Sequence, residues 1–156
     1  MTVTDPHTRL AELGLQLPAV TAPLAAYVPA IRTGDHVYVS GQLPMVDGKL
    51  LATGKVGREV APEQAKELAR RCALNALAAV NALIDLARVV RVVKVVGFVA
   101  SADGFTGQPG VVNGASELLG EVFGPAGQHA RSAVGVSELP LGAPVEVELI
   151  VEVASG

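Results

Sequence analysis

The sequence predicts an α+β domain in which a mixed β-sheet carries two helices on one face. Two observations lead to this class. Apolar and polar residues alternate at a period of two near both ends of the chain, as they do in half-buried strands. Residues 62–86 contain no Gly or Pro beyond the first turn and repeat their apolar residues at helical spacing. The expected order is three strands, a long helix, a strand, a second helix and two strands.

Turn residues and β-branched runs set the limits of the elements. Gly14 ends a short first helix, and Pro29 favours a position at a sheet edge. The Asp47-Gly48 pair forms a turn that leads into a third strand at residues 46–50, so the first three strands are expected to form a β-meander. The expected elements are helices at residues 8–13, 62–86 and 111–123, strands at residues 27–32, 36–42, 89–100, 130–136 and 145–153, and a loop at residues 107–110.

Composition limits the class of protein further. A chain of 156 residues, 50% of them hydrophobic, is expected to form one domain over residues 1–156, with residues 1–24 as an N-terminal arm. Aromatic residues make up only 3%, so the core must be aliphatic. A net charge of -3 argues against a protein that binds mainly by neutralising phosphates, so nucleic acid is not the expected partner.

Targeting and cysteine usage predict a cytoplasmic protein. The N-terminus lacks the basic start and apolar run of a signal peptide. The longest apolar stretch, Val89–Val96, is interrupted by Arg91 and Lys94 and is too short to span a bilayer. Cys72 is the only cysteine, which excludes an internal disulfide and a cysteine-based metal cluster.

The strand at residues 130–136 carries a candidate anion site. Arg131 shares a strand face with Ala133 and Gly135, whose small size leaves room above the guanidinium for a planar anion such as a small carboxylate. We expect Ala133, Gly135 and Ile150 on the open face of the sheet, where a subunit interface would cover them. The alternative is a surface arginine that pairs with an acidic neighbour.

The last strand offers two candidate carboxylates. Glu146 and Glu148 share the face opposite its valines. In a plain hairpin of the last two strands, Glu146 would lie opposite Gly135 rather than Arg131, so direct pairing of the two does not follow. No histidine or aspartate joins the carboxylates at ligand spacing, and we therefore expect no metal site.

Several blocks together resemble the Rid family, the reactive intermediate deaminases that are also called the YjgF family. The resemblance covers residues 25–153, and the sequence looks like that of a longer subgroup of the family. The matching blocks are Tyr27, Val39-Ser40-Gly41-Gln42-Leu43-Pro44, Asn113, Ala130-Arg131-Ser132, and Leu139-Pro140 through Val145-Glu146-Val147-Glu148.

The resemblance implies a chorismate-mutase-like fold and a homotrimer with active sites in the clefts between subunits. It also implies hydrolysis of 2-imino acids or their enamine tautomers to 2-keto acids and ammonia, without a metal or an organic cofactor. Arg131 would bind the substrate carboxylate and Glu146 would position or activate water. The residues that would line the pocket are Tyr27, Ser40, Gly41 and Asn113.

Three residues depart from the usual pattern of that family. His129 stands in place of a proline, Ala133 in place of a cysteine, and Ser116 near the place of an aromatic residue. His129 shares strand parity with Arg131, so we expect it to add a polar group that titrates near neutral pH to the substrate pocket. Substrate preference is therefore open.

Each candidate also has an ordinary structural interpretation. Tyr27 can cover the core, Ser40 can satisfy the backbone, Asn113 can cap the second helix, and His129 can lie at the rim of the pocket. For the catalytic carboxylate, the alternative to Glu146 is Glu148.

Two further functions also stay open. One is a regulatory module that binds small carboxylates without turnover, and the other is an endoribonuclease-type activity, which the acidic balance disfavours.

Overall fold

The described parts of the chain contain ten helices and strands and three single turns of 3₁₀ helix. A computed structural model describes residues 5–20 and 26–156. The elements are α1 (Pro6–Glu12), β1 (Ala30–Thr33), β2 (His36–Gln42), β3 (Met45–Val46), β4 (Lys49–Leu50), α2 (Pro62–Leu83), β5 (Val89–Ala100), α3 (Gln108–Phe123), β6 (Ala130–Val136) and β7 (Val145–Val153), with 3₁₀ turns at Leu86–Arg88, Gly124–Gly127 and Pro140–Gly142.

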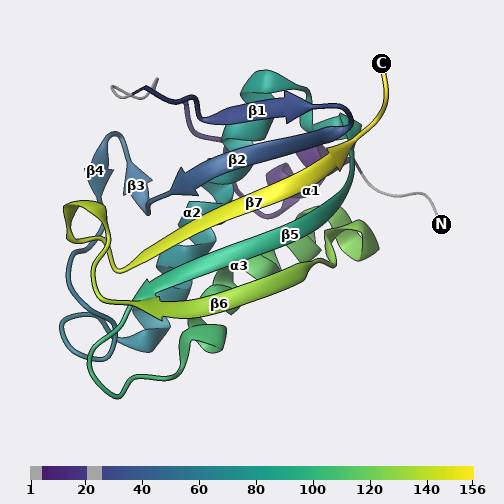
Figure 1. Cartoon of the computed structure of the whole chain (residues 1–156). Coiled ribbons are helices and arrows are strands. Elements are labelled where there is room, and N and C mark those ends of the chain that lie inside the picture. The colour runs from purple at the N-terminus through teal and green to yellow at the C-terminus, as the bar shows by residue number, and fades with distance from the viewer. Residues whose placement is uncertain (1–4, 21–25) are drawn as a thin grey trace.

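The main sheet has five strands in the order β1-β2-β7-β5-β6, and α2 and α3 cover one of its faces (Figure 1). Strands β5 and β6 run parallel, while the other neighbours are antiparallel. The α+β class with a mixed sheet and both long helices on one face is therefore confirmed. Strand β1 is an edge strand, in agreement with the effect expected of Pro29.

The predicted third strand of the meander does not join this sheet. Asp47 and Gly48 do form the expected turn, with φ of 52° and 77°. However, the strands that they connect, β3 and β4, pair only with each other as a separate two-stranded hairpin. The expectation of a three-stranded meander was wrong, because a tight turn sets the local pairing and not the position of the hairpin in the fold.

The last two strands do not form the plain hairpin that was considered for them. Strand β7 lies between β2 and β5, and β6 pairs with the other side of β5. A parallel pair needs a crossover connection, and α3 provides it between β5 and β6. Arg131 is consequently aligned with Val95 of β5 and not with any residue of β7.

The sheet separates an aliphatic core from an open face. Alternate residues of β7, from Val145 to Val153, are fully buried against the helices, as predicted. Ile150 lies on the open face beside Tyr38. Ala133 and Gly135 lie on the helix-covered face instead, because they are aligned with two buried residues of β5, so their expected place on the open face was wrong.

The two long helices differ slightly from their predicted limits. Helix α2 ends at Leu83, and Asp85 caps the following 3₁₀ turn by accepting a hydrogen bond from the backbone nitrogen of Ala87 at 2.8 Å. Helix α3 begins at Gln108, within the segment expected to be a loop. The helices pack very closely at Gly114, where a Cβ atom would lie 1.9 Å from the carbonyl oxygen of Lys66.

The described part of the N-terminal arm packs against the domain. Leu10 of α1 is buried, and Nε of Arg9 donates a hydrogen bond to the carbonyl oxygen of Glu121 at 3.0 Å. Residues 1–4 and 21–24 of the expected arm lie outside the described residues. No helix within the described ranges is long and apolar enough to cross a membrane.

Candidate functional site

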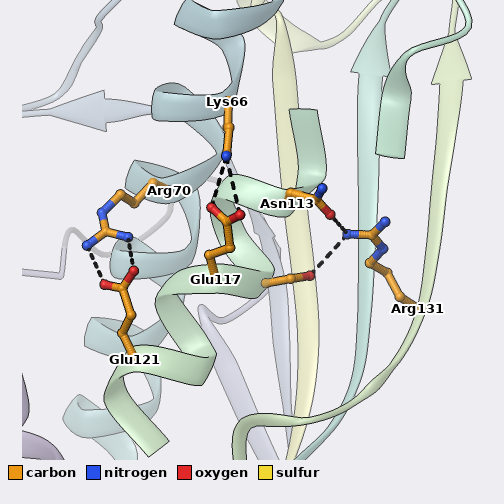
Figure 2. Close-up of polar contacts among 7 residues, drawn as sticks. Lys66, Arg70, Asn113, Glu117, Glu121 and Arg131 are labelled. Carbon is orange, nitrogen blue, oxygen red and sulfur yellow. Dashed lines mark hydrogen bonds and ion pairs between the residues drawn. The ribbon is translucent and has the colours of Figure 1, made fainter. Parts of the chain in front are cut away.

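Arg131 projects from β6 toward α3, where two side chains hold it (Figure 2). Its Nη1 donates hydrogen bonds to Oδ1 of Asn113 at 2.8 Å and to Oγ of Ser116 at 3.2 Å. These two bonds use both hydrogens of Nη1. Among the described residues no partner is found for Nη2 or Nε, so one edge of the half-buried guanidinium keeps a fork of donors for a carboxylate.

Asn113 does not cap α3. Gly107 occupies the N-cap position, and Asn113 lies well inside the helix with its amide oxygen on Arg131. The capping interpretation was therefore wrong, and the structure joins Asn113 to Arg131. Ser116 is one helical turn further along the same face, which is why it reaches the same guanidinium.

His129 joins this group through Ser116. Its Nε2 lies 2.8 Å from Oγ of Ser116, and its Nδ1 lies 2.6 Å from the carbonyl oxygen of Gly127. Ser116 was noted in the sequence only as a departure from the family pattern, and its spacing of three residues from Asn113 is the signal that could have placed it in the site. We call Asn113, Ser116, His129 and Arg131 the arginine cluster.

Two ion pairs connect α3 to α2 on the side of α3 that faces away from Arg131 (Figure 2). Lys66 pairs with Glu117 at 3.0 Å and Arg70 pairs with Glu121 at 2.8 Å. Pairs as exposed as these contribute little to stability, about 0–1 kcal/mol each. They nevertheless give the four charged groups partners that lie away from the arginine cluster, so Arg131 has no acidic partner on this helix.

Glu146 lies on the open face, directly against Gly41. A Cβ atom on Gly41 would lie 2.8 Å from Cδ of Glu146, so only glycine leaves this carboxyl group its present place. Burial raises the pKa of the half-buried Glu146 above its ordinary value, and the neighbouring charge of Glu148 raises it further. A carboxylate of raised pKa accepts protons more readily than an exposed one, as a base requires.

Ser40 and Tyr27 also lie on the open face, but they line a hollow that Glu148 lines and Glu146 does not. The Oγ of Ser40 donates a hydrogen bond to the carbonyl oxygen of Val28 at 2.6 Å, so Ser40 does satisfy the backbone. Tyr27 precedes β1, is 58% exposed and does not cover the core. Both line a hollow of about 400 Å³ on the open face, which Glu148 also lines. We call Tyr27, Ser40, Gly41, Glu146 and Glu148 the carboxylate cluster.

The two clusters lie on opposite faces of the sheet. Arg131 is aligned with Val95 of β5, and Glu146 is aligned with Phe98. Val95 and Phe98 are three residues apart in a regular part of β5, so their side chains point in opposite directions. A single copy of the chain therefore does not bring Arg131 and Glu146 into one pocket.

The described residues offer no group of side chains that could bind a metal ion. Within residues 5–20 and 26–156, no three His, Cys, Asp or Glu side chains gather closely enough to hold a metal ion. Cys72 is fully buried under the sheet, and burial raises the pKa of its thiol well above the ordinary value. The thiol is therefore a core group and not a nucleophile.

Sequence comparison places most of the chain in one family. A model of the family described as Endoribonuclease L-PSP matches residues 18–153. Protein TCP17 of Trypanosoma cruzi is 46% identical over 145 residues, which cover 92% of this chain and 91% of that protein.

Solved structures agree with this match. The crystal structure of the protein Atu1372, of unknown function, from Agrobacterium tumefaciens superposes with a TM-score of 0.88 at 47% identity and covers 96% of this chain and 92% of that one. A candidate endoribonuclease from Shewanella oneidensis superposes with a TM-score of 0.92 at 32% identity and covers 96% of this chain and 100% of that one.

Proposed function

Because the chain belongs to the Endoribonuclease L-PSP family, within the YjgF or Rid superfamily, we propose that it hydrolyses 2-imino acids or their enamine tautomers to 2-keto acids and ammonia. The observation that carries the proposal is the donor fork of Arg131, which Asn113 and Ser116 hold in place while Nη2 and Nε have no partner among the described residues. A planar fork of this kind matches the carboxylate that all these substrates share.

The carboxylate cluster supplies the second requirement, an activated water. An imine carbon is already electrophilic, so a positioned water, a base and a proton donor are sufficient for its hydrolysis. Glu146 serves as the base, since its pKa is raised and Gly41 has no side chain to displace its carboxyl group. Tyr27 and Ser40 border the substrate, and no metal or organic cofactor takes part.

Assembly supplies the third requirement, which is to bring the two clusters together. Since they lie on opposite faces of the sheet, a complete site takes Arg131 from one copy and Glu146 from another. The open face is suited to such contact, because it leaves large apolar side chains uncovered, including Ile31 at 58%, Tyr38 at 45% and Val134 at 42%. We propose the homotrimer that the resemblance implies, with one site in each cleft between subunits.

A coupled assay tests this function. An amino-acid oxidase generates a 2-imino acid in solution, and the decay of the imine is followed with and without the protein. We expect faster decay with the wild-type protein and spontaneous decay with Arg131→Ala. Full activity in Arg131→Ala would contradict the proposal.

Binding without turnover is the main alternative. It predicts that calorimetry detects saturable binding of a 2-keto acid that Arg131→Ala abolishes, while imine decay stays at the spontaneous rate. That result would replace the enzyme with a regulatory module that uses the same arginine. An endoribonuclease activity has less support, because Glu146 and Glu148 place negative charge on the open face, where an RNA backbone would be repelled.

A further inference from the structure

A bulge in β2 determines how Gly41 lies against Glu146. Residues 39–42 of β2 lie opposite residues 147–149 of β7, so β2 carries one extra residue at this point. A bulge of this kind bends its strand and changes the direction of nearby side chains. Ser40 and Gly41 lie within the bulge, so its shape decides where these two members of the carboxylate cluster lie.

The chain leaves the main sheet directly after the bulge and makes a tight turn over residues 43–45. The carbonyl oxygen of Leu43 accepts a hydrogen bond from the backbone nitrogen of Met45 at 2.8 Å, and that of Pro44 accepts one from Leu51 at 3.1 Å. Bonds of this kind set the local shape of a turn. They do not connect the turn to the helices or to the main sheet, so its position in the domain depends on other contacts.

Two side chains of α2 make that connection. Nδ2 of Asn75 donates hydrogen bonds to the carbonyl oxygens of Leu43 at 3.0 Å and of Met45 at 3.1 Å, which uses both of its hydrogens. Nε of Arg71 donates a further bond to the carbonyl oxygen of Met45 at 3.1 Å. Arg71 and Asn75 are one helical turn apart, so they reach the turn from the same face of α2. Asn75 thus supplies two of these three hydrogen bonds.

The position of the turn affects Glu146 through a short stretch of backbone. Gly41 lies two residues before Leu43 in the chain. Between them, Nε2 of Gln42 donates a hydrogen bond back to the carbonyl oxygen of Ser40 at 3.0 Å, across the bulge. A Cβ atom on Gly41 would lie 2.8 Å from Cδ of Glu146, so a small shift of Gly41 changes the space that this carboxyl group occupies.

We propose that Asn75 is a positioning residue for Glu146, because its two hydrogen bonds hold the turn that fixes Gly41 against the Glu146 carboxyl group. Asn75 acts through the backbone of β2 and not by contact with the substrate. This inference rests on the proposed deaminase function, in which Glu146 is the base. Precise placement matters for such a base, since a misplacement of about 1 Å can lower a rate roughly 100-fold.

Charged and titratable groups close to Glu146 lie on β7 and α2. Burial is the main cause of its raised pKa, and the charge of Glu148 on the same strand is the second. On α2, Arg71 carries a charge, and the buried thiol of Cys72 lies within reach of the Glu146 charge. Phe98, which is aligned with Glu146 on β5, carries none. Loss of the amide that holds the turn leaves these groups in place, so a looser turn would change the pKa through hydration and lower it.

Asn75→Ala and Asn75→Leu remove both hydrogen bonds, and Asn81→Ala is the matched control. Leucine is close to asparagine in size and carries no charge, so Asn75→Leu leaves no cavity. Asn81 lies on the same helix, is also half-buried and also bonds to the backbone, because its Oδ1 accepts a hydrogen bond from the backbone nitrogen of Leu86 at 3.0 Å. Asn81→Ala should therefore cost a similar amount of stability without affecting the bulge. Asn75→Gln, which keeps both amide hydrogens on a longer side chain, should restore part of the wild-type behaviour.

Two measurements follow the Glu146 carboxyl group. NMR titration of its side-chain carbon gives the pKa without any assay of activity, and imine hydrolysis gives kcat. We expect Asn75→Ala and Asn75→Leu to lower the pKa toward the ordinary value of 4.5 and to lower kcat roughly 10-fold. Keto-acid affinity should stay unchanged, because Arg131 keeps its partners on α3. Asn81→Ala should match wild type in all three quantities.

The outcomes separate the role of Asn75 from the function on which it rests. An unchanged Glu146 pKa in folded Asn75→Ala and Asn75→Leu would overturn the inference. Equal shifts in Asn81→Ala would show a general loosening of α2 and would overturn it too. A wild-type protein that binds a keto acid without accelerating imine decay would overturn the deaminase function, and the NMR titration would still show whether Asn75 positions Glu146.

Discussion

The two clusters differ in how firmly the chain holds their central charged groups. Arg131 is held by two side chains of α3, and one of these is itself held by His129. Glu146 keeps its position mainly because Gly41 has no side chain, which leaves space for the carboxyl group. The cationic cluster is thus preorganised by hydrogen bonds within one copy, whereas the acidic cluster lies open on a face with exposed apolar groups.

This difference indicates what each half does on its own. A preorganised donor fork can bind a carboxylate in an isolated copy. A half-buried carboxylate with raised pKa needs a second surface to enclose its water and bring a substrate to it. Binding and chemistry therefore separate between the faces of the sheet, and mutations in the two clusters should have different consequences.

The largest effect is expected from the arginine cluster. Arg131→Ala removes the carboxylate anchor and should lower kcat/KM roughly a thousandfold. This factor corresponds to a loss of about 4 kcal/mol of binding free energy. Keto-acid binding, measured by calorimetry, should be lost in parallel. Arg91→Ala, which removes an exposed arginine from the neighbouring strand, is the control and should leave both unchanged. Retained keto-acid affinity in Arg131→Ala would mean that the anchor lies elsewhere.

The carboxylate cluster should affect turnover and not binding. Glu146→Gln should lower kcat roughly 100-fold or more, with keto-acid affinity largely kept. A base must be deprotonated, so wild-type kcat should fall as pH drops through the raised pKa of Glu146, above the ordinary glutamate value of 4.5. Glu148→Gln is the matched control. A larger loss in Glu148→Gln would transfer the role of base to Glu148.

Stability should report the same raised pKa with a definite sign. The folded protein binds a proton at Glu146 more tightly than the unfolded chain does, so ionised Glu146 lowers stability at higher pH. Glu146→Gln should therefore have a higher Tm than wild type near neutral pH. The difference should shrink as the pH falls through the raised pKa and disappear below 4.5, whereas a constant difference would point to another cause.

The smallest effect on turnover is expected from crowding the carboxylate. Gly41→Ala places a methyl group in the space that the Glu146 carboxyl group occupies, so this side chain must move. We expect kcat to fall roughly 10- to 100-fold through misplacement alone. Gly120→Ala is the control, because a Cβ atom there meets nothing within 4 Å, and it should raise stability by about 0.5–1 kcal/mol without affecting kcat. Equal kcat in Gly41→Ala and wild type would remove the proposed role of the close contact.

Local pattern predicted much of the fold, and non-local pairing explains the errors. The alternation in residues 145–153 correctly predicted the buried face of β7. It did not reveal that β7 pairs with β5 rather than β6, because strand order depends on how distant segments pack. For the same reason, parity grouped Arg131 with Ala133 and Gly135 correctly but could not tell which face of the sheet they share.

Contacts within the site show the same limit. The resemblance named Gly41, Asn113, Arg131 and Glu146, and the structure joins them into two pairs. Ser116 was missed as a site residue, since its role appears only when α3 and β6 lie together. The function of the pairs remains a proposal, and it requires that the pairs meet across subunits.

Complementation between two inactive variants tests that requirement most directly. Arg131→Ala keeps Glu146, and Glu146→Gln keeps Arg131, so a mixed assembly contains some clefts with both groups intact. Co-expressed with separable tags and purified as mixed assemblies, the two variants should regain imine hydrolysis that neither has alone. Mixed assemblies that stay as inactive as the separate variants would contradict a site shared between copies.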